Sequence, residues 1–238
     1  MIVSTKAIVL SAIKYGDTSL IVKCLTASSG IHSYLLKGVL KSKKGKLKAA
    51  YFQPLTQLEI VASHNNKASL QHLREARVYY TYTSVYADIK KGAIAFFIAE
   101  VLANAIHEEE ANKIMYQFVE TSLQWLDTHD ETANFHMIFL IQLTRYLGFY
   151  PDNSESSLPF FDLQEGAFTR RATSTGIGDN ELVVFKQFLA TSYDKGVQIP
   201  LRKAERSALL KTLLTFYQLH IHGFKKPRSI TVLNEIFN

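Results

Sequence analysis

Cysteine is almost absent from this chain, and its scarcity excludes two kinds of site. The 238 residues contain one cysteine, Cys24. A single thiol can form neither an intramolecular disulfide nor a multi-cysteine metal site. Cys24 lies among Ile21, Val22 and Leu25, so we expect a buried and inert thiol. The sequence therefore predicts no bound metal and no cofactor.

Long apolar runs are also lacking. The most apolar stretch, residues 93–106, is interrupted by Glu100 and Asn104. It is too short to cross a bilayer, so a buried helix is the better interpretation. Residues 1–6 lead directly into a strand-like pattern and lack the layout of a signal peptide. We therefore expect a cytoplasmic protein without a membrane partner.

Catalytic motifs are missing as well. The sequence contains no Walker loop, no nucleophile elbow and no carboxylate pair placed for catalysis. The glutamates at 108–110 are interpreted as a charge cluster at a helix N-terminus, where the helix dipole favours them. We predict that the protein is not an enzyme, and a helical catalytic domain is the weakest hypothesis. The histidines considered as ligands are scattered: His64, His72, His107, His129, His136, His220 and His222.

Positive charge, in contrast, is concentrated at the start of the chain. The net charge is +6, but residues 1–80 hold 12 Lys+Arg against 3 acids, a balance of +9. Residues 81–238 hold 15 Lys+Arg against 18 acids, a balance of −3. This asymmetry indicates that a polyanion meets the N-terminal part. The alternative is a solvated lysine face without a partner.

Short segments of period-two hydrophobicity fill the first eighty residues. Turn signals around residues 16, 29 and 65 separate some of them. Several short strands at this spacing are typical of a small barrel or sandwich. Five strands in about eighty residues match the size of an OB-fold, which commonly binds single-stranded nucleic acid or oligosaccharide. The predicted strands cover residues 5–11, 19–25, 30–38, 52–61 and 70–78.

The hydrophobic period becomes helical from about residue 84. The sequence thus predicts a multidomain α+β protein, with an OB-fold β-barrel domain at 1–80 and a helical domain at 81–238. An irregular insert at 150–178 contains two short β-like pieces, at 159–163 and 167–171. The predicted helices cover residues 88–106, 109–126, 134–147, 179–193, 202–222 and 229–237.

A lysine-rich segment lies between the third and fourth predicted strands. It spans residues 37–48 and contains six lysines and no acid. Lysine suits phosphates whatever the base sequence, and lysines beside aromatic rings are typical of single-strand binding. The alternative is a solvated loop. The candidate nucleic-acid-binding lysines are Lys37, Lys41, Lys43, Lys44, Lys46 and Lys48.

Aromatic and arginine residues flank this segment. Tyr34 lies before it and Tyr51 after it, so both rings are candidates for stacking on bases. Packing inside the barrel is the alternative for Tyr51 and the favoured interpretation for Phe52. Arg74 and Arg77, near the end of the barrel region, either extend the basic face or pair with Glu75 and the acids of the helical domain.

Four segments, taken in order, resemble the bacterial RecO family of DNA repair proteins. Residues 6–21 resemble the family's first strand, Gly-Asp turn and second strand, and residues 30–48 resemble a strand leading to a basic turn. Residues 52–59 are similar to the family's strand with a Phe followed three residues later by a Leu, and residues 223–233 to a C-terminal element. The similarity follows nearly the whole chain in order and length.

The resemblance implies a mediator of recombination, without catalysis, that is associated with the nucleoid. Such a protein binds single- and double-stranded DNA, anneals complementary strands and acts with RecR to load the recombinase RecA. Its helical domain receives the acidic, Phe-terminated tail of the single-strand-binding protein. The lysine-rich segment alone fits a second function equally well, that of an OB-fold RNA-binding or ribosome-associated protein.

Many members of the family also carry a four-cysteine zinc module. The corresponding residues here, 147–176, contain no cysteine. We therefore expect packing by Phe160, Phe161 and Phe168 to organise the insert in place of zinc. Stoichiometric zinc in the purified protein would contradict this expectation.

Overall fold

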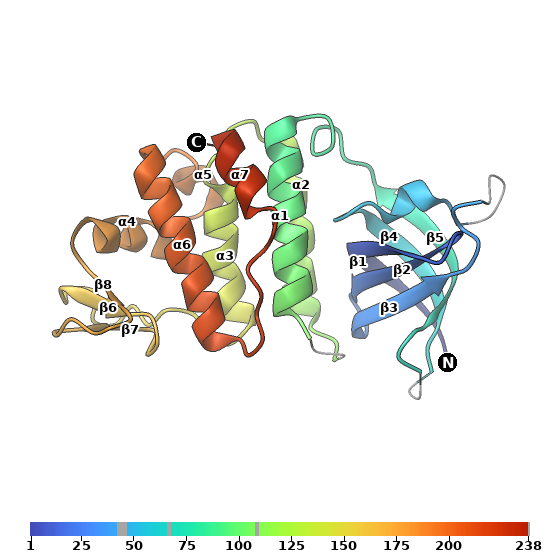
Figure 1. Cartoon of the computed structure of the whole chain (residues 1–238), viewed down its shortest axis with the longest axis horizontal. Coiled ribbons are helices and arrows are strands. Elements are labelled where there is room, and N and C mark those ends of the chain that lie inside the picture. Colours follow the sequence, from blue (N-terminus) through green and yellow to red (C-terminus); the bar gives the residue numbers. More distant parts are fainter. Residues whose placement is uncertain (42–46, 66–67, 108–109, 238) are drawn as a thin grey trace. The chain divides into compact units, whose positions relative to one another are not determined.

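The chain folds into two compact units. A computed structural model describes residues 1–41, 47–65, 68–107 and 110–237. The first unit comprises Met1–Thr128 and the second His129–Asn238. The change from strands to helices falls earlier, between a strand that ends at Tyr80 and a helix that begins at Ile89 (Figure 1). The boundary predicted at residue 80 coincides with this change in secondary structure, and the division into domains at that residue stays a prediction.

Five antiparallel strands of the first unit form a closed barrel. Their order is β3-β2-β1-β4-β5. The two outer strands meet through a parallel bridge between Tyr34 and Gln71, where the Gln71 amide donates to the Ser33 carbonyl oxygen at 2.7 Å. This confirms the predicted five-stranded OB-fold. The elements are β1 (Ile2–Tyr15), β2 (Ser19–Thr26), β3 (Gly30–Leu36), the 3-10 turn η1 (Ala49–Phe52), β4 (Gln57–Ser63) and β5 (His72–Tyr80).

Strand β1 is longer than the predicted 5–11 at both ends. Its first half pairs with β4 and its second half with β2. The buried side chains of β1 end at Leu10, and the last four residues, 12–15, are all exposed. These last residues pair through their backbone with the start of β2. Hydrophobic periodicity does not report such an exposed strand end, because it records burial rather than pairing.

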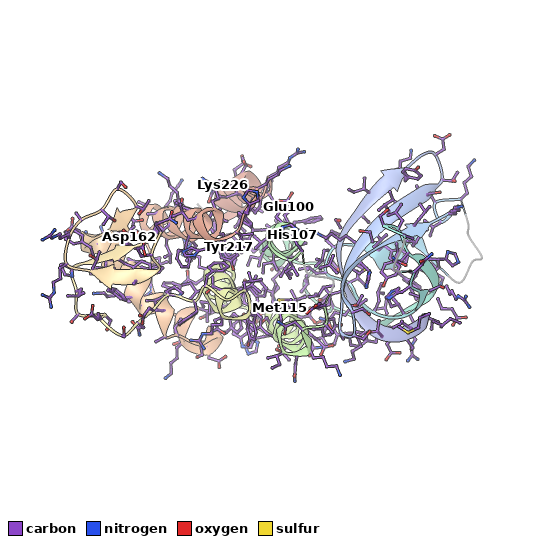
Figure 2. The ribbon with its side chains drawn as sticks, turned by 90° about the horizontal axis from the view of Figure 1, so that it is seen from below. Glu100, His107, Met115, Asp162, Tyr217 and Lys226 are labelled. Carbon is purple, nitrogen blue, oxygen red and sulfur yellow. The ribbon has the colours of Figure 1, made fainter. Side chains whose placement is uncertain are left out.

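Two helices, α1 (Ile89–Ala105) and α2 (Lys113–Thr128), complete the first unit. The Asp88 carboxylate caps α1 by accepting from the Lys91 amide at 2.9 Å. The Asn112 side chain caps α2 by accepting from the amide of Met115, labelled in Figure 2, at 2.9 Å. Glu110 lies two residues before the capping Asn112, and the first turn of α2 has no acid, so the predicted role of the glutamates 108–110 stays a prediction; Glu108 and Glu109 lie outside the described residues.

Asp127, near the end of α2, holds the connection between β5 and α1. Its carboxylate accepts from the backbone amides of Thr83, Ser84 and Val85 at 2.8–3.1 Å. Burial by itself raises the pKa of this carboxyl, but the backbone hydrogen bonds outweigh burial and hold its pKa at about 2. The buried ammonium group of Lys91 donates to the Asp127 carbonyl oxygen at 3.1 Å. Asp127 therefore joins the end of α2 to the connection before α1, through its carboxylate, and to α1 itself, through its carbonyl oxygen.

Two lysines of the barrel also contact these helices. The Lys23 ammonium group donates to the carbonyl oxygen of Ala103, in the last turn of α1, at 2.6 Å. Lys6 forms an ion pair with Glu120 of α2 at 3.0 Å and lies over the Tyr79 ring at 4.5 Å. These contacts explain why α1 and α2 form one compact unit with the barrel.

The second unit combines helices with a small sheet. Tyr217 is fully buried, and its hydroxyl donates to the Leu140 carbonyl oxygen at 2.7 Å, which ties α6 to α3. In the part of the chain that the structure describes, no helix is long and apolar enough to span a membrane. The elements are α3 (Phe135–Tyr146), β6 (Phe160–Asp162), β7 (Ala167–Thr169), β8 (Gly176–Ile177), α4 (Asp179–Leu189), α5 (Tyr193–Gly196), α6 (Lys203–His220) and α7 (Ile230–Phe237).

The three-stranded insert has no residues suited to a zinc module. Phe161 and Phe168 are buried as expected, with ring centroids 5.0 Å apart, whereas Phe160 is only partly buried. Asp162 (Figure 2) accepts from the Gln164 amide at 2.8 Å and from the Thr175 hydroxyl at 2.8 Å. Aromatic packing and this carboxylate therefore hold the turns of the insert. Among the residues described, no group of three or more His, Cys, Asp or Glu side chains could hold a metal.

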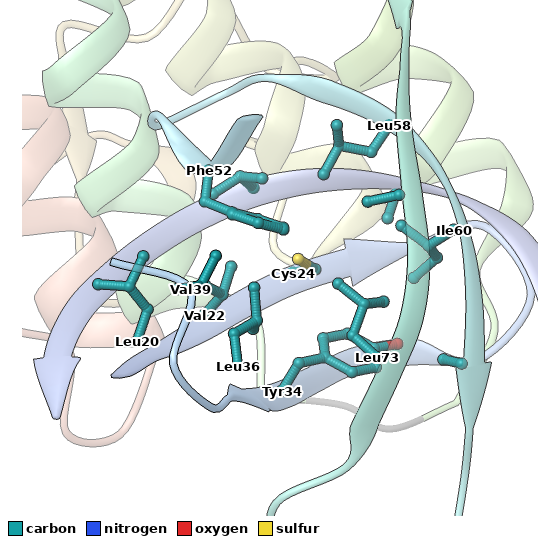
Figure 3. Close-up of a cluster of buried hydrophobic side chains, with 14 residues drawn as sticks. Leu20, Val22, Cys24, Tyr34, Leu36, Val39, Phe52, Leu58, Ile60 and Leu73 are labelled. Atoms are coloured by element: carbon teal, nitrogen blue, oxygen red, sulfur yellow. The ribbon is translucent and has the colours of Figure 1, made fainter. Parts of the chain in front are cut away.

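The barrel interior is filled by inward-facing residues of all five strands. Figure 3 shows Cys24 and Tyr34 among aliphatic side chains such as Val22, Leu36 and Leu73. Cys24 is 1% exposed, and burial raises the pKa of its thiol to about 12. The predicted buried, inert thiol is therefore confirmed. A closed and packed core leaves only the rim and the outer face of the barrel available for a ligand.

Candidate nucleic-acid interface

The predicted lysines fall into two groups in the structure. Lys37, Lys41 and Lys48 are exposed on the turns that follow β3 and precede η1. Lys43, Lys44 and Lys46 lie outside the described residues.

The turn that carries Lys37 and Lys41 is fixed to the turn between β1 and β2. The Leu40 amide donates to the Thr18 carbonyl oxygen at 2.9 Å, and the Gly38 amide donates to the Ser19 hydroxyl at 3.3 Å. Gly38 has a φ of +69°, a conformation that other residues adopt only with strain. The two turns therefore form one edge of the barrel.

Lys14 belongs to this edge and was not among the predicted site residues. It is exposed on the extended end of β1, opposite Leu20 of β2, and Leu20 is opposite Leu36, the neighbour of Lys37. We call Lys14, Lys37 and Lys41 the basic edge. The predicted strand ended at residue 11, before the turn at Gly16. Extending that strand to the turn would have placed Lys14 at the barrel edge.

Arg77 does not add a free cation to the interface. Its guanidinium group forms an ion pair with Glu59 on the neighbouring strand β4, and its Nε donates to the same carboxylate at 3.1 Å. The sequence left pairing open as one alternative, with Glu75 or the acids of the helical domain as partners; Arg77 does pair, but its partner is the partly exposed Glu59 of β4. Arg74 is exposed on β5.

The two predicted stacking aromatics differ from each other. Tyr34 is fully buried in the barrel core, and its hydroxyl lies 3.0 Å from Nε2 of His64. Its prediction as a stacking residue is wrong, because a fully buried ring offers no face to a base. Tyr51 is partly buried against the core, with the Lys48 ammonium group 5.7 Å from its ring centroid. Phe52 is 3% exposed, as the packing alternative expected.

His32 was not among the histidines considered in the sequence. Its ring packs against that of His64 in a tilted arrangement, with ring centroids 4.1 Å apart. Burial lowers the pKa of His64, and the nearby His32 and the N-terminal ammonium group lower it further. The Met1 ammonium group also donates to the His64 carbonyl oxygen at 2.8 Å. These contacts make the pair part of the packing at the end of the barrel that holds the N-terminus.

An open cavity of about 630 Å³ lies in the second unit, between the start of α3 and the start of α6. Its lining combines apolar side chains, among them Ile199 and Leu201, with Arg202 and Arg206. The Nε of Arg206 is buried without a hydrogen-bond partner among the described residues. Glu131 and Glu205 also line the cavity, so its charge is balanced.

A small closed barrel with exposed lysines along one edge is typical of proteins that bind nucleic acids. Comparison with known proteins narrows this class. The family model "Recombination protein O N terminal" matches residues 1–82, and "Recombination protein O C terminal" matches residues 86–229.

Named relatives are similar over their whole length. The DNA repair protein RecO of Christiangramia forsetii is 47% identical over 238 residues, which cover 100% of both chains. The corresponding proteins of Flavobacterium psychrophilum and Flavobacterium johnsoniae are 46% and 44% identical, again with 100% of each chain covered. The chain belongs to the RecO family of non-enzymatic mediators of DNA repair and recombination. With one cysteine, it is a member without the four-cysteine zinc module.

Proposed function

We propose that the barrel, residues 1–80, binds single- and double-stranded DNA through the basic edge and the lysines that follow it. The protein then anneals complementary strands and acts with RecR to load RecA. The observation that supports this proposal is the gathering of Lys14, at the end of β1, with Lys37 and Lys41, on a turn that is hydrogen-bonded to the turn after β1. Lysines on such turns meet phosphates without reading the base sequence.

The binding experiment measures affinity for single-stranded DNA as a function of salt. Replacing both Lys37 and Lys41 with Ala removes up to two phosphate contacts, and each contact contributes about 0.7 to the salt slope of a single strand. We therefore expect weaker binding and a slope reduced by up to about 1.4. The matched control replaces Lys203 and Lys211, two exposed lysines of α6, and removes the same charge. An unchanged slope in the first variant would exclude the basic edge as the DNA site.

The mediator activity is tested by annealing of complementary oligonucleotides coated with the cognate single-strand-binding protein. We expect the wild-type protein to accelerate annealing and the Lys37/Lys41 variant to do so less. RNA competition belongs to the same experiment. If RNA displaces DNA at low concentration and annealing is not accelerated, the RNA-binding alternative is favoured.

We further propose that the cavity of the second unit receives the acidic, Phe-terminated tail of the single-strand-binding protein. Apolar walls suit an aromatic ring, and an arginine suits a carboxylate. Arg202 lines the cavity, and its side chain is 88% exposed although its Nε lies 3.5 Å from the Glu205 carboxylate. We expect Arg202→Glu to weaken binding of a tail peptide several-fold, with Lys211→Glu as the control on the same helix. Equal binding by both variants would exclude this cavity.

A further inference from the structure

The extended end of β1 presents an aromatic ring that the sequence prediction did not use. Tyr15 is 55% exposed and Ile13 is 64% exposed, although both lie in a regular strand. They point to one face of the strand, since they are two residues apart. Strand pairing fixes their position, because Ile13 lies opposite Ile21 and Tyr15 opposite Ser19.

This ring lies directly beside the basic edge. Ser19, the residue opposite Tyr15, accepts a hydrogen bond from the amide of Gly38, next to Lys37. Lys14, the neighbour of Tyr15 in sequence, points to the other face of the strand, so the ring lies on the side of Lys37. Asp17 also lies in the turn, so three lysines and one aspartate leave this edge with a net charge of +2. The ring is therefore held where a bound phosphate backbone would pass.

We propose that Tyr15 is the base-stacking residue of the interface and that its occupant is an unpaired base of single-stranded nucleic acid. This inference rests on the proposed DNA binding. An exposed ring next to phosphate-binding cations is the arrangement by which proteins hold single strands without sequence preference. Tyr34, one of the two rings predicted from the sequence, is buried in the core. A base paired within a duplex keeps its faces covered by its neighbours, so Tyr15 gives the protein a preference for single strands.

The experiment compares two oligonucleotides of equal length and charge, one of thymidylates and one of abasic sites. The wild-type protein should bind the base-bearing strand more tightly than the abasic strand. Tyr15→Ala should lose about tenfold in affinity for the thymidylate strand and little for the abasic strand, as stacking of one base requires. Tyr15→Phe should keep the preference because the ring remains, whereas Tyr15→Leu, which keeps apolar bulk, should lose it.

Phe96→Ala is the matched control, because Phe96 lies on α1 of the same unit and is 57% exposed. If Tyr15→Ala behaves like Phe96→Ala while the Lys37/Lys41 variant binds both strands weakly, the stacking role is excluded and the DNA site stands. If both Tyr15→Ala and the Lys37/Lys41 variant bind the two strands with wild-type affinity, the DNA site itself is excluded. If Tyr15→Ala weakens both strands equally, the ring is not a stacking platform.

Discussion

Lysines on two sides of the barrel differ in their contacts: on one side they pair with the helices, and on the other they are exposed. On the side that carries the helices, Lys6 pairs with Glu120 and Lys23 donates to the end of α1. On the basic edge, Lys14, Lys37 and Lys41 are exposed. Lysines of the first side stabilise the fold, and those of the second are available to a polyanion.

This difference shows why net charge overstates a binding surface. Residues 1–80 have a balance of +9, but Lys6, Lys23 and Arg77 are held by partners within the first unit. A cation that already pairs with a carboxylate contributes less to a phosphate, because binding must first break the pair. Substitutions on the two sides should therefore separate stability from DNA binding.

The largest expected effect is that of Asp127→Ala on the helix-bearing side. The change leaves the amides of Thr83, Ser84 and Val85 without their acceptor. Loss of several hydrogen bonds to one buried charged group costs about 3 kcal/mol. We expect this decrease in the free energy of unfolding by urea denaturation, with little change in DNA affinity of the folded protein. A wild-type midpoint would show that the connection is held by other contacts.

The same carboxylate predicts a dependence of stability on pH. Its pKa in the folded state is lowered to about 2 from an ordinary value of 3.8. Stability from a depressed carboxyl pKa is fully present above the unfolded-state value and is lost as pH falls through the folded-state value. We therefore expect the difference in unfolding free energy between wild type and Asp127→Asn to shrink between pH 4 and pH 2. A difference that stays constant over this range would contradict the assignment.

Lys23→Met should have the next largest effect on stability. Methionine keeps the apolar stem but removes the ammonium group that donates to Ala103 at 2.6 Å. A charged hydrogen bond near a helix C-terminus stabilises by about 1.5 kcal/mol. Lys14→Met on the basic edge is the control, for which we expect an unchanged unfolding midpoint and weaker DNA binding. Thermal denaturation and binding titrations of both variants check the two expectations together.

Tyr34→Phe tests whether Tyr34 stabilises the barrel core or binds a base. Removing the hydroxyl leaves Nε2 of the buried His64 without this partner, which costs about 1 kcal/mol. We expect a lower melting temperature and wild-type affinity for single-stranded DNA. Reduced affinity at full stability would return Tyr34 to the interface.

Local pattern was sufficient to predict most of the fold. Alternation and turn residues indicated the five strands, and helical spacing indicated the helices, because each element buries one face. Local pattern could not predict which residues the lysines contact, because these contacts join distant parts of the chain. Lys6 and Glu120 are 114 residues apart in sequence, and Lys23 and Ala103 are 80 apart. A count of charges cannot distinguish a lysine that packs from one that is free.

The site was predicted in part for the same reason. The turn with Lys37 and Lys41 was identified by its composition, whereas Lys14 and Tyr15 were missed because an exposed strand end has no hydrophobic signature. The error on Tyr34 was avoidable, since it shares the parity of the buried Leu36 on β3 and therefore points inward.

The smallest effects are expected at the two arginines of β5, which lie on one strand but differ in their contacts. Arg77 is 75% exposed at its side chain and pairs with Glu59, and an exposed pair of this kind contributes at most about 0.5 kcal/mol. Arg77→Ala should therefore change neither stability nor DNA affinity measurably. Arg74→Ala should weaken DNA binding about twofold and reduce its salt slope by up to about 0.7 if Arg74 contacts a phosphate. Salt titrations of DNA binding by the two variants, run in parallel, decide whether Arg74 contacts a phosphate. Equal salt slopes would confine the interface to the basic edge and the lysines that follow it.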